Sequence, residues 1–173
     1  KKKRNMTKWY LILEELHKQG LIGAGGVTRV LLAGPPGTGK SSFPHYSMKE
    51  NAERAYLTED SGPEDLIGTY TLLDGSTVFV NGPATRAMLG GKVLVLDEID
   101  RSSSSISSIL HGILDDPSIA SITLPTGKRA TAKDGFVVFA TMNGNPGLLD
   151  EALLDRFDLV LVCKEPHPGI LKT

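Results

Sequence analysis

The chain has 173 residues, of which 40% are hydrophobic and 23% are charged, so it carries enough apolar material for one folded domain and is not a disordered chain. Lysine and arginine (19) nearly balance aspartate and glutamate (20), and a net charge of −1 gives no long-range attraction to nucleic acid or to an anionic membrane. The single cysteine, Cys163, excludes an internal disulfide and a cysteine-based zinc site. No run approaches the roughly 20 apolar residues of a membrane helix and no signal peptide is visible, so we expect a cytoplasmic protein without membrane insertion.

Short apolar strands alternate with helices along the chain. In chain order we expect a helix at 7–19, a glycine-rich connector at 23–26, a strand at 27–33, a helix at 41–52, a strand at 54–58, a helix at 83–89, a strand at 93–96, a helix at 106–114, a strand at 136–140, a helix at 148–154 and a strand at 159–162. Pro44 removes a backbone hydrogen bond from the second helix, which predicts a local distortion. This alternation predicts a parallel sheet that is covered by helices on both faces.

Two β-hairpins are expected as insertions between these elements. Asp74-Gly75 separates the strand-like segments 70–73 and 77–80, and such a pair is a strong hairpin signal. Pro125-Thr126-Gly127 separates residues 119–124 from 129–132 in the same way.

A phosphate-binding loop follows the first expected strand. The eight residues from Gly34 to Ser41 match the pattern G-x-x-x-x-G-K-[ST] in full. Glycines let backbone N–H groups turn toward phosphate oxygens, Lys40 places a cation on the β- and γ-phosphates, and the Ser41 hydroxyl is an oxygen ligand for Mg²⁺. The nucleotide is therefore expected to contact Gly34, Pro35, Pro36, Gly37, Thr38, Gly39, Lys40, Ser41 and Ser42.

Two acidic residues, Asp97 and Glu98, end the apolar strand 93–96. Ligands of open α/β sheets bind at the carboxyl edge of the strands. Asp97 suits the carboxylate that holds the magnesium shell, and Glu98 suits the carboxylate that polarises the attacking water. Without the phosphate loop upstream, the same pair would read equally well as the solvated end of a strand.

These motifs resemble the Walker A and Walker B motifs of AAA+ ATPases. Further segments resemble the MoxR-like and dynein-related (midasin-like) branch of that family, and the resemblance covers about residues 25–165. The segments that carry it are residues 65–68, 82–88, 124–127, 135–143 and 151–157. The resemblance implies a P-loop NTPase fold of the AAA+ large subdomain, with a five-stranded parallel sheet flanked by helices and inserted β-hairpins that project toward a central pore or a partner.

The resemblance also implies a homo-oligomeric ring, usually hexameric, with ATP at subunit interfaces. It makes Asn143 the sensor that orients the attacking water, although Asn143 also suits a simple turn. It makes Arg156 the arginine finger of the neighbouring site. A surface ion pair of Arg156 with Asp155 or Asp158 is the alternative, and Arg86 or Arg101 can instead approach the neighbour.

We expect three parts in the chain: an N-terminal helix and connector (1–26), the ATPase core (27–165) and a tail (166–173). Family members carry a helical lid after the core, and we expect this chain to lack it. The expected function is binding and hydrolysis of ATP with Mg²⁺, which drives chaperone-like remodelling of an unknown protein client. The alternatives are a nucleotide-gated binding module with incidental hydrolysis, and a DNA motor or initiator, which the balanced charge disfavours.

Overall fold

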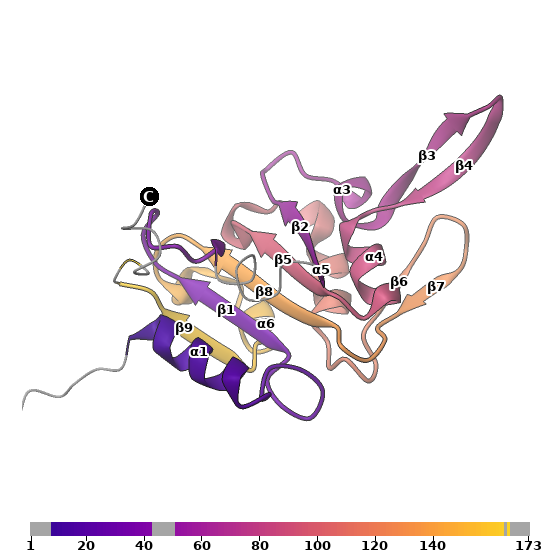
Figure 1. Ribbon diagram of the computed structural model, residues 1–173. Helices are drawn as coiled ribbons and strands as arrows, with labels where there is room; N and C mark the ends of the chain where they lie inside the picture. Colours follow the sequence, from indigo (N-terminus) through magenta and orange to yellow (C-terminus); the bar gives the residue numbers. More distant parts are fainter. Residues whose placement is uncertain (1–7, 43–50, 165, 167–173) are drawn as a thin grey trace, which may run out of the picture.

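The protein is described here by a computed structural model that covers residues 8–42, 51–164 and 166. Its centre is a five-stranded sheet of order β2-β5-β8-β1-β9, in which every neighbouring pair is parallel (Figure 1). The strands are β1 (Arg29–Ala33), β2 (Ala52–Tyr56), β5 (Val93–Asp97), β8 (Val137–Met142) and β9 (Leu159–Val162). The predicted α/β fold with a five-stranded parallel sheet is thus confirmed.

Helices cover both faces of this sheet, which explains why its central strands are mainly apolar. On one face, α1 (Trp9–Lys18) places Trp9, Tyr10 and Leu13 in a core with alternate sheet residues such as Val30 and Phe139. The opposite face packs the remaining alternate residues against four helices. These are α3 (Pro63–Ile67), α4 (Pro83–Gly90), α5 (Ser107–Ile113) and α6 (Glu151–Leu154).

Several boundaries differ from the predicted ones. The helix expected at 41–52 extends too far, because Ala52 already pairs with Val93 as the first residue of β2. Residues 43–50, with the distortion expected at Pro44, lie outside the described residues. The helix α3 has only 5 residues, too few for a recognisable period. Short 3₁₀ turns η3 (Ser104–Ile106) and η4 (Pro146–Leu148) lie at the starts expected for the helices 106–114 and 148–154, and a third turn, η2 (Ile99–Arg101), follows β5.

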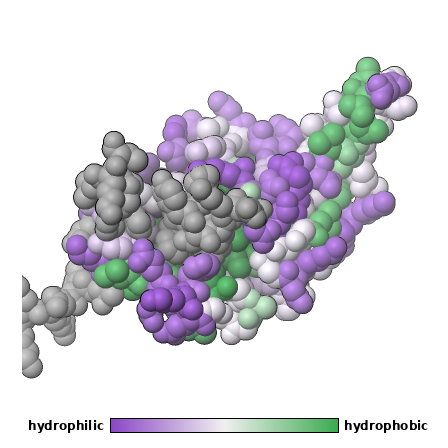
Figure 2. All heavy atoms as spheres, viewed as in Figure 1, coloured by the Kyte–Doolittle hydropathy of each residue, from purple (hydrophilic) through white to green (hydrophobic). Residues whose placement is uncertain are grey.

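Both expected hairpins are present and antiparallel: β3 (Gly68–Leu73) with β4 (Ser76–Asn81), and β6 (Ser121–Thr123) with β7 (Arg129–Thr131). Asp74 (φ 49°) and Gly75 (φ 78°) both have positive φ, as a two-residue hairpin turn requires. The β3–β4 hairpin projects away from the sheet (Figure 1), and apolar side chains lie along it (Figure 2). Leu72 is 73% exposed there.

The carboxyl edge of the sheet brings distant segments together. Gly34 follows β1, Asp97 ends β5 and Asn143 follows β8. Connections from β1 and β8 leave in opposite directions across the sheet, and this switch point is where open α/β sheets bind ligands.

Within the described ranges, no helix combines the length and the apolar character needed to cross a membrane.

Candidate functional site

The phosphate loop is fixed to the carboxyl end of β1 by both neighbouring strands. The Gly34 N–H donates a 3.1 Å hydrogen bond to the Met142 carbonyl of β8, and the Cys163 N–H donates a 2.6 Å bond to the Ala33 carbonyl. A Cβ on Gly34 would collide with the Cys163 carbonyl oxygen, so only glycine fits at this close approach. Gly37 (φ 82°) has the left-handed backbone that lets the loop curl.

Lys40 lies inside the loop and is only 7% exposed. Its Nζ donates hydrogen bonds of 2.9 Å to the Gly34 carbonyl and 2.7 Å to the Pro35 carbonyl. Burial lowers the pKa of Lys40, while the acidic groups of Cys163, Asp100, Glu98 and Asp97 oppose that shift. The ammonium thus donates to loop carbonyls and also interacts electrostatically with the acidic pair Asp97 and Glu98.

Ser41 and Asp97 bring the two predicted motifs into direct contact. The Ser41 hydroxyl donates a 2.6 Å hydrogen bond to Asp97 Oδ1, and the Thr141 hydroxyl donates a second, of 3.1 Å, to the same oxygen. Asp97 is 1% exposed, and its other oxygen, Oδ2, is buried without a hydrogen-bond partner among the described residues. A buried carboxylate oxygen left in this way is poised to accept a cation.

These residues fit a magnesium ion. Mg²⁺ prefers hard oxygen ligands and is usually held by one or two protein groups together with substrate phosphates and water. Asp97 and the Ser41 hydroxyl are such ligands, and they already lie within hydrogen-bond distance of each other. Asp97 Oδ2, which is buried and accepts no hydrogen bond from the described residues, is the observation that favours a metal here.

Glu98 is held by the same threonine. Its N–H donates a 3.1 Å hydrogen bond to Thr141 Oγ1, and its backbone is left-handed (φ 59°, ψ 48°). Its carboxylate accepts a 3.1 Å bond from Arg101 Nη1 and is 39% exposed. Asn143, half-buried, directly follows Met142, whose carbonyl binds the start of the loop. Both residues thus lie at the expected edge of the sheet.

Arg156 lies elsewhere. Its Nε donates a 3.1 Å hydrogen bond to Asp115 Oδ1, and its Nη1 donates a 2.9 Å bond to the Ala152 carbonyl. It precedes β9, so it lies near the amino ends of the strands, opposite the phosphate loop. The ion pair is with Asp115, so the suggested pairing with Asp155 or Asp158 is wrong.

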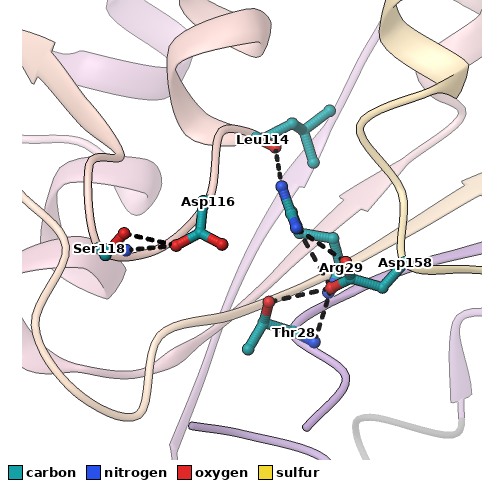
Figure 3. Close-up of polar contacts among 6 residues, drawn as sticks. All are labelled: Thr28, Arg29, Leu114, Asp116, Ser118 and Asp158. Carbon is teal, nitrogen blue, oxygen red and sulfur yellow. Dashed lines mark hydrogen bonds and ion pairs between the residues drawn. The ribbon is translucent and has the colours of Figure 1, made fainter. Parts of the chain in front are cut away.

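Asp158 instead joins β9 to the start of β1 (Figure 3). Its carboxylate accepts hydrogen bonds from the backbone and hydroxyl of Thr28, both 3.0 Å, and forms a 2.7 Å ion pair with Arg29. Arg29 Nη1 also donates a 3.0 Å bond to the Leu114 carbonyl. Burial alone would raise the pKa of Asp158, but the donors Arg29 and Thr28 outweigh it and hold the pKa below its usual value.

Two residues of the site were not predicted. Thr141 connects Asp97 and Glu98, and its one signal was a polar residue within the apolar strand that precedes Asn143. Arg54 of β2 reaches both motifs: its Nη2 donates a 2.5 Å hydrogen bond to the Ser41 carbonyl, and its Nε lies 3.5 Å from Asp97 Oδ2. No local pattern marks Arg54, because its role depends on which strand lies beside β5.

Comparison with known proteins identifies the family of the chain. The family model of the AAA domain, dynein-related subfamily, matches residues 29–157, which include the phosphate loop and the acidic pair. The chain belongs to this family. The AAA+ resemblance, with its MoxR-like and dynein-related branch, is therefore confirmed.

Curated relatives of this AAA domain are similar at moderate identity. Protein NorQ of Paracoccus denitrificans is 36% identical over 117 residues, which cover 66% of this chain and 43% of NorQ. Protein YojN of Bacillus subtilis is 38% identical over 146 residues, which cover 76% of this chain and 46% of YojN. The chain thus spans about half the length of these relatives.

A solved structure shows the same fold. It is a protein from Cytophaga hutchinsonii that is thought to be an ATPase, with a TM-score of 0.65 and 23% identity. The similarity covers 94% of this chain and 48% of the other.

Proposed function

We propose that this AAA domain binds ATP with Mg²⁺ and hydrolyses it. The observation that carries the proposal is the 2.6 Å hydrogen bond between Ser41 and Asp97, which unites the phosphate loop with the acidic strand end. A hydroxyl and a carboxylate placed in this way suit a magnesium ion that also contacts the nucleotide phosphates. When bound, that ion would neutralise charge on the phosphates.

The residues around this contact have complementary roles in the proposal. The Gly34–Ser42 loop binds the phosphates, and Lys40 exchanges its two carbonyl partners for phosphate oxygens. Glu98 acts as the general base that polarises the attacking water, and Asn143 orients that water. Both follow strand ends at the carboxyl edge that carries the loop.

Arg156 acts in a neighbouring subunit under this proposal. It lies at the opposite edge of the sheet from its own phosphate loop, which supports a role in trans. A guanidinium there would stabilise the charge on the transferred phosphoryl group. This favours a ring, which we propose to be hexameric and to remodel a protein client.

The division into parts at 1–26, 27–165 and 166–173 and a cytoplasmic location stay predictions.

The test replaces the proposed base. We expect Glu98→Gln to lower phosphate release at least about 100-fold while the protein retains bound ATP, because a positioned general base contributes on the order of 10² or more. Glu15→Gln, at an exposed position of α1, is the matched control and should release phosphate at the normal rate. Unchanged turnover in Glu98→Gln would remove Glu98 from this role, and absence of ATP binding by the unaltered chain would refute the proposal.

A further inference from the structure

Arg54 contacts both halves of the candidate site from the edge strand β2. In the β2–β5 register it lies opposite Val95, two residues before Asp97. Its Nη2 donates a 2.5 Å hydrogen bond to the Ser41 carbonyl, and its Nε lies 3.5 Å from Asp97 Oδ2. Its Nη1 donates a 3.3 Å bond to the Tyr56 hydroxyl, which supports the guanidinium from the solvent side.

The Asp97 carboxylate needs a positive partner because it is buried. Its Oδ1 accepts two hydroxyl hydrogen bonds, whereas Oδ2 accepts none from the described residues. Lys40 binds loop carbonyls instead, so among the described residues Arg54 is the one cation within 4.0 Å of this carboxylate. An uncompensated buried charge is costly, so Arg54 stabilises the site in the state without metal.

We propose that Arg54 is a positioning residue, the counter-ion of Asp97 while no metal is bound. The inference rests on the proposed function. Arg54 balances the negative charge of Asp97 until magnesium binds with the nucleotide and balances that charge in its place. Through its hydrogen bond to Ser41, Arg54 also keeps the two proposed metal ligands in register.

The charge of Arg54 affects nucleotide binding most when no metal is present. ATP that arrives without metal brings its negative phosphates toward Asp97, and Arg54 offsets the repulsion between them. With magnesium present, the two positive charges of the ion lie beside Asp97, so the charge of Arg54 has much less effect on ATP affinity. Arg54 therefore makes ATP binding less dependent on magnesium.

The experiment titrates ATP into the full chain, once in EDTA and once in excess Mg²⁺. We expect Arg54→Gln to weaken ATP binding about tenfold in EDTA and less than about threefold with Mg²⁺, a coupling of ordinary size. Arg54→Lys keeps the charge, so in EDTA it should lose clearly less ATP affinity than Arg54→Gln does. Arg129→Gln removes the same charge from the β6–β7 hairpin, where Arg129 bonds Ser121, and should change neither affinity.

An Asp97→Asn background tests whether Arg54 acts through Asp97. In EDTA, adding Arg54→Gln to Asp97→Asn should change ATP affinity less than about twofold, because the charge to be balanced is gone. A tenfold loss that persists in this background would mean that Arg54 acts on the phosphates directly and would overturn the inference. Equal weakening in EDTA and Mg²⁺ would overturn it too.

Two further outcomes are distinguishable. If the unaltered chain binds ATP in neither buffer, the proposed function fails, and the inference fails with it. If Arg54→Gln does not fold, as judged by its circular dichroism melt, the double variant Arg54→Gln/Asp97→Asn decides. Restored folding supports the counter-ion role, and continued unfolding refutes it.

Discussion

Replacing Thr141 with valine should damage both stability and turnover. Thr141 is 3% exposed, and its hydroxyl donates to Asp97 Oδ1 and accepts from the Glu98 N–H, each at 3.1 Å. Valine keeps the shape and removes both bonds. Losing a bond to a charged group costs about 1.5–3 kcal/mol, and an unsatisfied N–H costs about 1–3 kcal/mol. Ser41 still donates to Asp97, so we expect a total of about 3 kcal/mol.

Thr141→Ser is the matched control, because it keeps the hydroxyl and loses one methyl group, at a cost of about 1 kcal/mol. Urea unfolding measures the free energy of unfolding of both variants, and phosphate release measures their turnover. Thr141→Val should also lower turnover about tenfold or more, because Glu98 loses a bond that holds its left-handed backbone. A serine variant less stable than the valine variant would refute this reasoning, since packing would then outweigh the hydrogen bonds.

Two further predictions concern titratable groups. The pKa of Asp158 is held below its usual value, so its contribution to stability is complete above about pH 4 and is lost as the pH falls through the folded pKa. Urea unfolding at a series of pH values should therefore show the deficit of Asp158→Asn shrinking in acid, and a deficit independent of pH would contradict this. Burial raises the pKa of Cys163 to about 12, against the effect of Lys40, so iodoacetamide at pH 8 should label the folded protein at least about 100-fold more slowly than the protein in urea. Mass spectrometry measures both rates, and similar rates would show that the thiol is accessible.

Contiguous signals explain what the sequence predicted well. Four of the five strands of the parallel sheet are short, mainly apolar runs, whereas β2 carries Glu53 and Arg54, and the Asp74-Gly75 turn marks one hairpin by its own chemistry. The phosphate loop is equally local, since its eight residues carry their spacing with them. The sequence alone therefore predicted the sheet, both hairpins and the two motifs of the site.

Contacts across the sheet explain what it missed. Arg54 meets Asp97 because β2 lies beside β5, and Thr141 meets Asp97 because β8 lies on the other side. Strand order depends on the packing of the whole chain, so neither contact has a local sequence signal. Arg156 pairs with Asp115 for the same reason, since α5 brings that residue to the amino edge of the sheet.

Calorimetric titration of Mg·ATP into the full chain, beside Lys40→Ala, tests the central claim most directly. Both hydrogen bonds of the Lys40 ammonium are to carbonyls of its own loop. Their loss is therefore local, and we expect the variant to fold while lacking the cation that is proposed to bind the phosphates. We predict saturable binding of one nucleotide per chain and at least about tenfold weaker binding by Lys40→Ala at an unchanged fold. No heat of binding in the unaltered chain, or equal affinity in the two proteins, would contradict the account.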